Sequence, residues 1–136
     1  MADALQLEVA TPERELVREE VTEVQLPTQD GYLGVLPGHA PLLSQLGIGY
    51  LTYVAAGRRR YLSVAGGFVE VLPGHVRVLA DVAERAEDID VERARRAAQR
   101  ATEEMINPNL GVDPAVALAA LQRAETRLGA SENKTA

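Results

Sequence analysis

Five arginines in the last third of the sequence have the spacing needed to bind an anion. Arg93, Arg96 and Arg100 are three and four residues apart, which places them on one face of a helix, and Arg123 and Arg127 form an i, i+4 pair further on. Guanidinium groups bind phosphate and carboxylate oxygens through paired hydrogen bonds. If the two segments pack as antiparallel helices, both sets meet. The sequence then predicts a site for a polyphosphate or for an acidic protein surface.

An ordinary solvated surface is the alternative for these arginines. Glu92 with Arg96 and Arg100 with Glu104 have the i, i+4 spacing of helical ion pairs, which contribute little to stability when they are exposed to water. Spacing along a helix fixes which residues share a face but not what that face meets. The sequence alone therefore leaves nucleotide binding, docking to an acidic partner and a solvated face open.

Other kinds of chemistry have few side chains to carry them. The chain of 136 residues has no cysteine and two histidines, His39 and His75. We therefore expect no metal site, no redox pair and no catalytic triad. A hydrolase that uses Ser44 or Ser63 with one of the histidines is the weakest hypothesis, because neither serine lies in a GxSxG turn. We expect no catalytic residues.

His39 lies in residues 36–42, between two prolines. Proline fixes its own φ and disfavours helix at the preceding residue, so this segment predicts a rigid, exposed loop. Exposed loops carry binding residues more often than core segments do. Two interpretations of His39 follow, a contact for a partner and a plain turn.

The arginines require two helices to position them, and the sequence marks both. Asp90 and Asp113 are suitable N-caps, and Pro114 takes the favoured first helical position. The segment 107–111, Asn-Pro-Asn-Leu-Gly, breaks the helical pattern between them, and Gly129 is the expected C-cap of the second helix. Because the link is short, the two helices are expected to form an antiparallel hairpin.

The apolar stripes of the two helices consist mostly of alanine. Members of the first stripe are Val91, Ala94, Ala98, Ala101 and Met105, and members of the second are Ala117, Leu121, Ala124 and Leu128. A buried methylene contributes only about 0.8 kcal/mol, so alanine stripes hold helices together weakly. We expect a hairpin that is marginal on its own and depends on what it packs against. Such an element is a candidate switch.

Residues 1–82 have the pattern of short strands. Apolar residues alternate with polar ones at the start, and Gly and Pro clusters separate the later apolar segments. This pattern favours an antiparallel sandwich or barrel. The pair Gly66–Gly67 is interpreted as a bulge or a close backbone approach, because no phosphate-loop sequence accompanies it. The expected strands are residues 5–9, 21–26, 32–36, 48–54, 59–64, 68–72 and 76–80.

The charge and hydropathy of the chain restrict its partners. There are 14 basic and 20 acidic residues, a net charge of −6, which argues against binding to a nucleic-acid backbone. No apolar run approaches the roughly 20 residues that span a bilayer, and the first residues lack the pattern of a targeting signal. A cytosolic or peripheral protein without a transmembrane segment is expected.

Three segments, in this order, resemble one known family. They are GYLGVLPGHAP at residues 31–41, VAGGFVEV at residues 64–71 and AERAEDIDVERA at residues 83–94. With a two-helix C-terminus behind them, the chain resembles the epsilon subunit of bacterial F-type ATP synthases over nearly its whole length.

The resemblance implies an α+β fold, with a ten-stranded antiparallel β-sandwich followed by a two-helix hairpin in residues 88–136. It implies a non-catalytic central-stalk subunit of a proton-translocating ATP synthase, bound to the gamma subunit and the c-ring. The hairpin would reach toward the catalytic alpha/beta head and restrain ATP hydrolysis. The expected location is the cytoplasmic side of a bacterial plasma membrane, peripheral to the bilayer.

The resemblance also implies site residues. The segment Ile-Asp-Val-Glu-Arg-Ala at residues 89–94 is similar to the Ile/Leu-Asp-x-x-Arg-Ala motif of the family. In members that bind ATP as a regulatory ligand, with no cofactor required, contacts fall at positions that correspond to Glu84, Ile89, Asp90, Arg93, Ala94, Arg100, Arg123 and Arg127. This gives the alternative function, a module that senses ATP by ordering the hairpin. Contacts to the c-ring are expected at Tyr32, where relatives often carry glutamate, and at His39.

Overall fold

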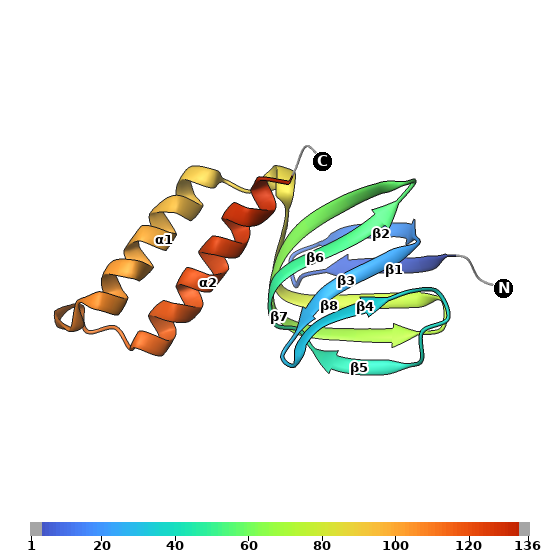
Figure 1. Ribbon diagram of the computed structural model, residues 1–136, viewed down its shortest axis with the longest axis horizontal. Helices are drawn as coiled ribbons and strands as arrows, with labels where there is room; N and C mark the ends of the chain where they lie inside the picture. Colours follow the sequence, from blue (N-terminus) through green and yellow to red (C-terminus); the bar gives the residue numbers. More distant parts are fainter. Residues whose placement is uncertain (1–3, 134–136) are drawn as a thin grey trace.

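The computed structural model describes residues 4–133, in which eight strands precede two helices (Figure 1). The first segment forms strands because it alternates buried and exposed side chains; in β1 the residues Leu5, Leu7 and Val9 are buried. The strands are β1 (Leu5–Ala10), β2 (Glu15–Val21), β3 (Glu23–Thr28), β4 (Gly31–Val35), β5 (Leu42–Gln45), β6 (Ile48–Ala55), β7 (Arg58–Leu72) and β8 (His75–Arg85).

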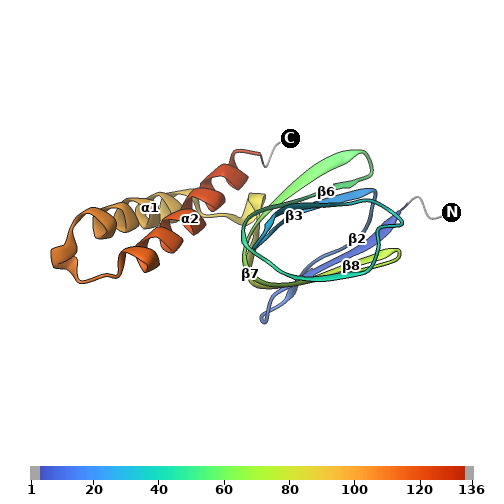
Figure 2. The same ribbon diagram turned by 60° about the horizontal axis from the view of Figure 1, so that its bottom comes forward.

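The strands form one hydrogen-bonded sheet that folds over itself into two layers, seen from a second direction in Figure 2. Its order is β2-β1-β8-β7-β6-β3-β4, and β5 pairs with β7. The pairs are antiparallel except for β1 and β8, which run parallel. The predicted β-sandwich is confirmed. The expectation of ten antiparallel strands is corrected to eight strands, with one parallel pair, in the described part of the chain.

One reason for the lower strand number is that β7 is continuous across residues 59–64 and 68–72, where two strands were expected. Its first part pairs with β6 and its last part with β5, and the change of partner falls at Gly66–Gly67. These glycines have φ of 73° and 113°, and a Cβ at Gly67 would collide with the carbonyl oxygen of Leu79. The register with β8 is the same on both sides of the pair. Gly66–Gly67 therefore marks a close backbone approach, as one of the two interpretations held, and not a bulge.

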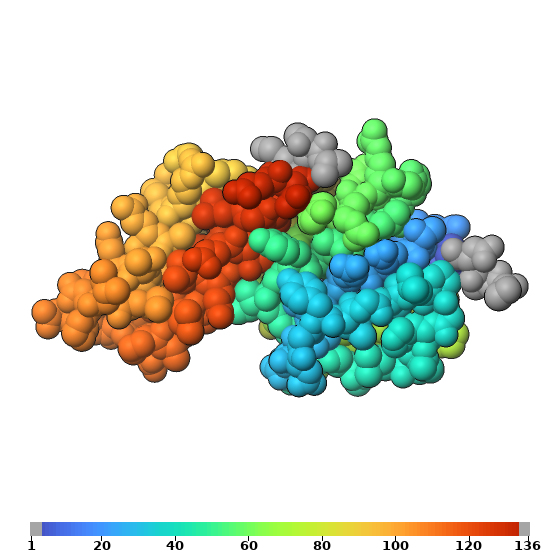
Figure 3. All heavy atoms as spheres, in the orientation of Figure 1, coloured from blue at the N-terminus to red at the C-terminus, as the bar shows by residue number. Residues whose placement is uncertain are grey.

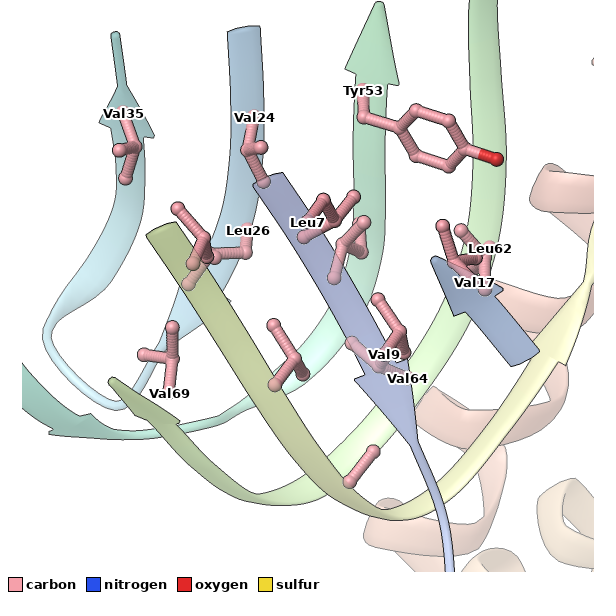
Figure 4. Packing of buried hydrophobic residues seen from close by; sticks show 14 of the residues in the cluster. Leu7, Val9, Val17, Val24, Leu26, Val35, Tyr53, Leu62, Val64 and Val69 are labelled. Atoms are coloured by element: carbon pink, nitrogen blue, oxygen red, sulfur yellow. The ribbon is translucent and has the colours of Figure 1, made fainter. Parts of the chain in front are cut away.

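One hydrophobic core fills the space between the layers. Leu7, Leu26 and Val69 come from different strands and point into the same interior, where all three are fully buried (Figure 4). Fully burying a leucine or valine stabilises a fold by about 1.5–3 kcal/mol. The core cluster lies between Leu5 and Ala80 and contains no helical residue. The sandwich therefore does not need the helices to complete its interior.

The helices begin at the predicted caps. α1 (Val91–Ile106) follows a short 3₁₀ turn, η1 (Ala86–Asp88), and the Asp90 carboxylate accepts a hydrogen bond from the Arg93 amide at 3.1 Å. A second 3₁₀ turn, η2 (Pro108–Leu110), leads to α2 (Pro114–Ser131). There Asp113 accepts from the Ala115 amide at 2.8 Å.

The expected end of the second helix is wrong. Gly129 lies inside α2, which continues to Ser131, and Glu132 is the C-cap. The physical reason is packing, because the glycine lies where α2 meets the sandwich and its missing side chain leaves room for Tyr50.

The hairpin rests on the sandwich mainly through one helix. α2 packs against β6 and β7, whereas α1 packs against α2 on the side away from the strands (Figures 1 and 3). The buried residues of the hairpin are almost all alanine, as the stripes predicted: Ala94 and Ala101 on α1, and Ala117, Ala124, Ala130 and Ser131 on α2. Within residues 4–133 no helix has the length and apolar character to cross a membrane.

Candidate functional site

A cavity of about 400 Å³ lies between the hairpin and the sandwich. It brings together four of the residues predicted to form a site, Glu84 from β8, Arg93 from α1, and Arg123 and Arg127 from α2. The remaining lining residues are small or apolar: Ser63, Val64, Ala65, Val82, Ala97, Ala120, Ala124 and Thr126. The antiparallel hairpin thus places arginines from both helices at one opening, as their spacing required.

Glu84 and Arg127 join the two halves of the molecule by an ion pair. Arg127 Nε lies 2.6 Å from Glu84 Oε1, and Arg127 Nη2 donates a hydrogen bond to Oε2 at 3.4 Å. The side chains are only 20% and 28% exposed, so this pair is screened less than a surface pair. It is therefore a specific link between α2 and β8.

Arg93 and Arg123 are available to a ligand. Across residues 4–133 neither guanidinium lies within ion-pair distance of a carboxylate. With Arg127 neutralised by Glu84, the cavity retains two positive charges. Phosphate groups satisfy such a pair of guanidinium groups through charge-assisted hydrogen bonds. The cavity is therefore suited to a polyphosphate that bridges the two helices.

Arg100 lies outside this cavity. Its side chain is 83% exposed, and its Nε donates to Glu104 at 3.0 Å, one of the ion pairs expected of a solvated face. Arg96 does not line the cavity either, and Glu92 pairs instead with Arg95 at 2.7 Å. The arginine set therefore divides in two, with one part at the cavity and one part facing solvent.

The motif at residues 89–94 positions Arg93 at the cavity. Asp90 caps α1 and holds the Arg93 amide, while Ile89 and Ala94 are buried on either side of the cap. These three residues do not line the cavity in this structure. In this structure they fix the start of α1, and the start of the helix determines the position of Arg93.

The small residues of the cavity are the part that sequence reasoning missed. Ala97 of α1 and Ala120 of α2 line the cavity, and so does Ser63 of β7, which is buried. Alanine at these positions leaves the volume that a larger side chain would fill. The available signal was alanine one turn from Arg93 and Arg123, on helices whose other faces are charged.

A second hollow of about 780 Å³ adjoins the first along α2 and shares Arg123 with it. Its polar lining includes Asp81, Gln122 and Glu125, so carboxylates accompany the arginine there. The strong excess of positive charge is therefore confined to the first cavity.

Tyr32 and His39 lie on the sandwich, away from the cavity lining. Tyr32 is 62% exposed, and its hydroxyl oxygen accepts a hydrogen bond from the Tyr50 amide at 3.0 Å. His39 lies in the loop between β4 and β5, where its Nδ1 donates to the Ala40 carbonyl at 2.7 Å. Both side chains thus have local structural contacts, and Tyr32 keeps most of its surface free.

An exposed apolar patch on β5, β7 and β8 was not predicted. Leu43, Phe68 and Leu79 are 70%, 52% and 55% exposed and lie on adjacent strands, with Phe68 directly opposite Leu79. Apolar side chains clustered on a surface mark sites of protein association. The alternation in 68–72 and 76–80 carried the signal, because both faces of these strands contain large apolar residues.

Comparison with known proteins gives one consistent assignment. Residues 4–86 match the family model described as ATP synthase, Delta/Epsilon chain, beta-sandwich domain, and residues 87–132 match its long alpha-helix domain. The ATP synthase epsilon chain of Solibacter usitatus is 67% identical over 134 residues, covering 98% of this chain and 100% of that protein. That of Koribacter versatilis is 47% identical over 105 residues, covering 77% of this chain and 74% of that protein.

The fold is also found in a solved assembly. A chain in the cryo-EM structure of the Euglena gracilis mitochondrial ATP synthase, OSCP/F1/c-ring in rotational state 1, superposes with a TM-score of 0.82 at 26% identity. The match covers 96% of this chain and 82% of that chain. Since both domain models and full-length relatives agree with the sandwich and hairpin described above, this chain belongs to the family of ATP synthase epsilon chains.

Proposed function

We propose that this protein is a non-catalytic central-stalk subunit of a proton-translocating F-type ATP synthase and that its hairpin regulates ATP hydrolysis. The observation that carries the regulatory part is the thin, alanine-lined attachment of the hairpin to a sandwich whose core is complete without it. A helix pair held in this way can leave the sandwich without unfolding it. The released helices then reach the catalytic alpha/beta head and restrain hydrolysis.

The sandwich provides the attachment to the rotor. The apolar patch of Leu43, Phe68 and Leu79 suits a protein partner, which we assign as the gamma subunit. Tyr32 has an aromatic body and a hydroxyl tip, a combination that suits an interface, and we assign Tyr32 and His39 to the contact with the c-ring. Rotation would pass between c-ring and gamma subunit through this rigid body, on the cytoplasmic side of a bacterial plasma membrane.

ATP is the regulatory ligand that the cavity fits best. Its phosphates carry the negative charge that Arg93 on α1 and Arg123 on α2 leave unbalanced, and a volume of about 400 Å³ is within the range of small-molecule sites. The cavity is lined by both helices and by β7 and β8, so a ligand that fills it binds the docked hairpin and not the released one. It therefore stabilises the docked form by mass action, by about 2.7 kcal/mol at a hundredfold excess over Kd.

The alternative, a free-standing ATP sensor, uses the same cavity without the stalk. Co-purification separates the two functions. A tagged full-length chain, expressed in its own host and extracted from membranes in mild detergent, is expected to bring down the gamma and c subunits. Recovery of the chain without them would contradict the stalk assignment, and a heat of binding for Mg-ATP on that isolated chain would then favour the sensor.

The regulatory role has its own test. Membranes that contain the chain without residues 89–136 are expected to hydrolyse ATP faster than membranes with the whole chain, at equal amounts of assembled enzyme. Equal rates would contradict regulation by the hairpin while leaving the stalk assignment intact.

A further inference from the structure

Gly129, in the last turn of α2, lies directly against the sandwich. A Cβ at Gly129 would overlap the hydroxyl oxygen of Tyr50 and would lie 2.8 Å from its Cζ and 3.2 Å from its Cε1. All three atoms belong to one rigid ring system, so the whole ring would have to turn to admit even a methyl group. Tyr50 thus occupies the notch that the missing side chain of Gly129 leaves in α2.

No backbone requirement explains the glycine. Gly129 lies within α2, two residues before its end, and its φ is outside the left-handed region. Glycine inside a helix is less favourable than alanine by about 1 kcal/mol. Alanine would therefore make the helix itself more stable. The contact with Tyr50 is the feature of the structure that requires glycine at this position.

Tyr50 is held firmly on the sandwich side of this contact. It lies in β6 opposite Ser63 of β7, and its amide donates to the Tyr32 hydroxyl at 3.0 Å. Burial raises the pKa of the Tyr50 hydroxyl, with smaller contributions from Tyr32, Glu132 and Glu125. The Tyr50 side chain is partly buried, and its hydroxyl end faces Gly129 of α2.

The same end of α2 carries further contacts. Ala130 and Ser131 are buried, and Asn133 Nδ2 donates to the Gly129 carbonyl at 3.0 Å. The Arg127–Glu84 ion pair lies half a turn earlier on the helix. Figure 1 shows this end of α2 beside the sandwich, while the other end of the hairpin lies far from it. Undocking of the hairpin must therefore break the contacts of this turn.

We propose that Tyr50 and Gly129 form a steric latch, in which the hairpin docks on the sandwich because position 129 has no side chain to strike the tyrosine ring. The inference extends the proposed regulatory function to a named contact and rests on that function only for its effect on hydrolysis. A side chain at position 129 removes the notch. It shifts the hairpin to the released state and leaves the sandwich core unchanged.

The test measures hairpin docking in the full-length isolated chain. The natural sequence has no cysteine, so Gln99→Cys on α1 and Asp30→Cys in the β3–β4 turn, both exposed, provide two unique positions for spin labels. Pulsed dipolar spectroscopy then reports the distance between hairpin and sandwich. The labelled parent is expected to give one short distance.

Gly129→Ala in this background is expected to raise the ratio of released to docked hairpin about tenfold or more, the effect of overpacking a tight contact. Gly34→Ala is the matched control, because a Cβ at Gly34 meets nothing within 4 Å. Tyr50→Ala combined with Gly129→Ala is expected to restore the short distance, since it removes the ring that the new methyl group strikes. Helical circular dichroism and the melting of the sandwich in Gly129→Ala are expected to match those of the parent.

Two results would overturn the latch. One is a Gly129→Ala distance distribution that matches Gly34→Ala, and the other is a released hairpin that Tyr50→Ala fails to restore. Assembled enzyme distinguishes this failure from that of the proposed function. If Gly129→Ala releases the hairpin in the isolated chain but leaves the rate of ATP hydrolysis unchanged, the latch stands and the regulatory role is refuted.

Discussion

Replacing Arg123 with alanine separates ligand binding from folding better than any other change at the cavity. Its guanidinium lines the cavity, yet it has no ion-pair partner within residues 4–133. The substitution therefore removes a ligand contact without leaving a buried charge behind. We expect Arg123→Ala to weaken binding of Mg-ATP while the melting temperature of the chain without ligand stays unchanged.

The size of the loss follows from the setting of Arg123. A hydrogen bond to a charged group contributes about 1.5–3 kcal/mol, and every 1.4 kcal/mol is tenfold in Kd. Arg123 is exposed to water in the structure, which screens its charge and favours the lower figure. We therefore expect Kd to rise about tenfold.

Isothermal titration calorimetry of the isolated chain with Mg-ATP measures this loss directly. Arg96→Ala is the matched control, because it removes the same charge from an exposed position that does not line the cavity. Arg96→Ala is expected to change Kd by less than about twofold, the effect of a distant screened charge. Equal losses in the two variants would refute a specific contact and would leave only a general effect of net charge.

Three further outcomes are expected. Arg127→Ala leaves Glu84 without its partner and should make hairpin docking less favourable by about 1 kcal/mol, a value discounted for the partial exposure of the pair. The spin labels described above measure the docked fraction, and an unchanged fraction would show that the pair does not stabilise docking. A chain ending at residue 88 should keep the cooperative melting of the sandwich, because the core cluster includes no helical residue, and a non-cooperative melt would contradict that division. The hydrogen bond from Arg77 holds the pKa of Glu8 below its ordinary value of 4.5. The stability that Glu8 contributes is therefore present above about pH 4.5 and is lost as the pH falls below that value. Glu8→Gln should make the stability less dependent on pH in the acid range, and an acid range unchanged from the parent would exclude Glu8 as its source.

Capping residues in the sequence predicted where the helices begin. The features that the sequence did not predict, the end of α2 and the continuity of β7, depend on tertiary contacts. Asp90 and Asp113 cap their helices as expected, since a cap needs only the amides of the next turn. Gly129 looked like a helix end because glycine usually serves there, yet the requirement it meets comes from Tyr50, a distant residue in the sequence. In the same way, the continuity of β7 depends on its successive partners β6 and β5, which no local pattern encodes.

The sequence pattern predicted which arginines share a face of α1, but not which of them lie at the cavity. Arg93 and Arg100 share a face of α1, because seven residues make nearly two turns. Two turns also carry Arg100 about 10 Å along the axis. At that distance its side chain is 83% exposed and pairs with Glu104. Periodicity could not show where the cavity ends, because the cavity is closed by β7 and β8 and not by the helix that carries the arginines.

Because the buried apolar residues of α2 are alanines, the interface between hairpin and sandwich can both hold the hairpin and bind a ligand. On the described part of α2 the buried apolar residues are Ala117, Ala124 and Ala130, and each buries a single methyl group. If the helices were spaced to admit it, leucine at each of these positions would add about 2 kcal/mol. Two such leucines would exceed the stabilisation that a ligand supplies at a hundredfold excess over Kd, about 2.7 kcal/mol. A switch needs docked and released states close enough in free energy for the ligand to choose between them. The same small side chains leave the cavity open, so a hairpin stripe rich in leucine would lose both the site and the ability to respond to it.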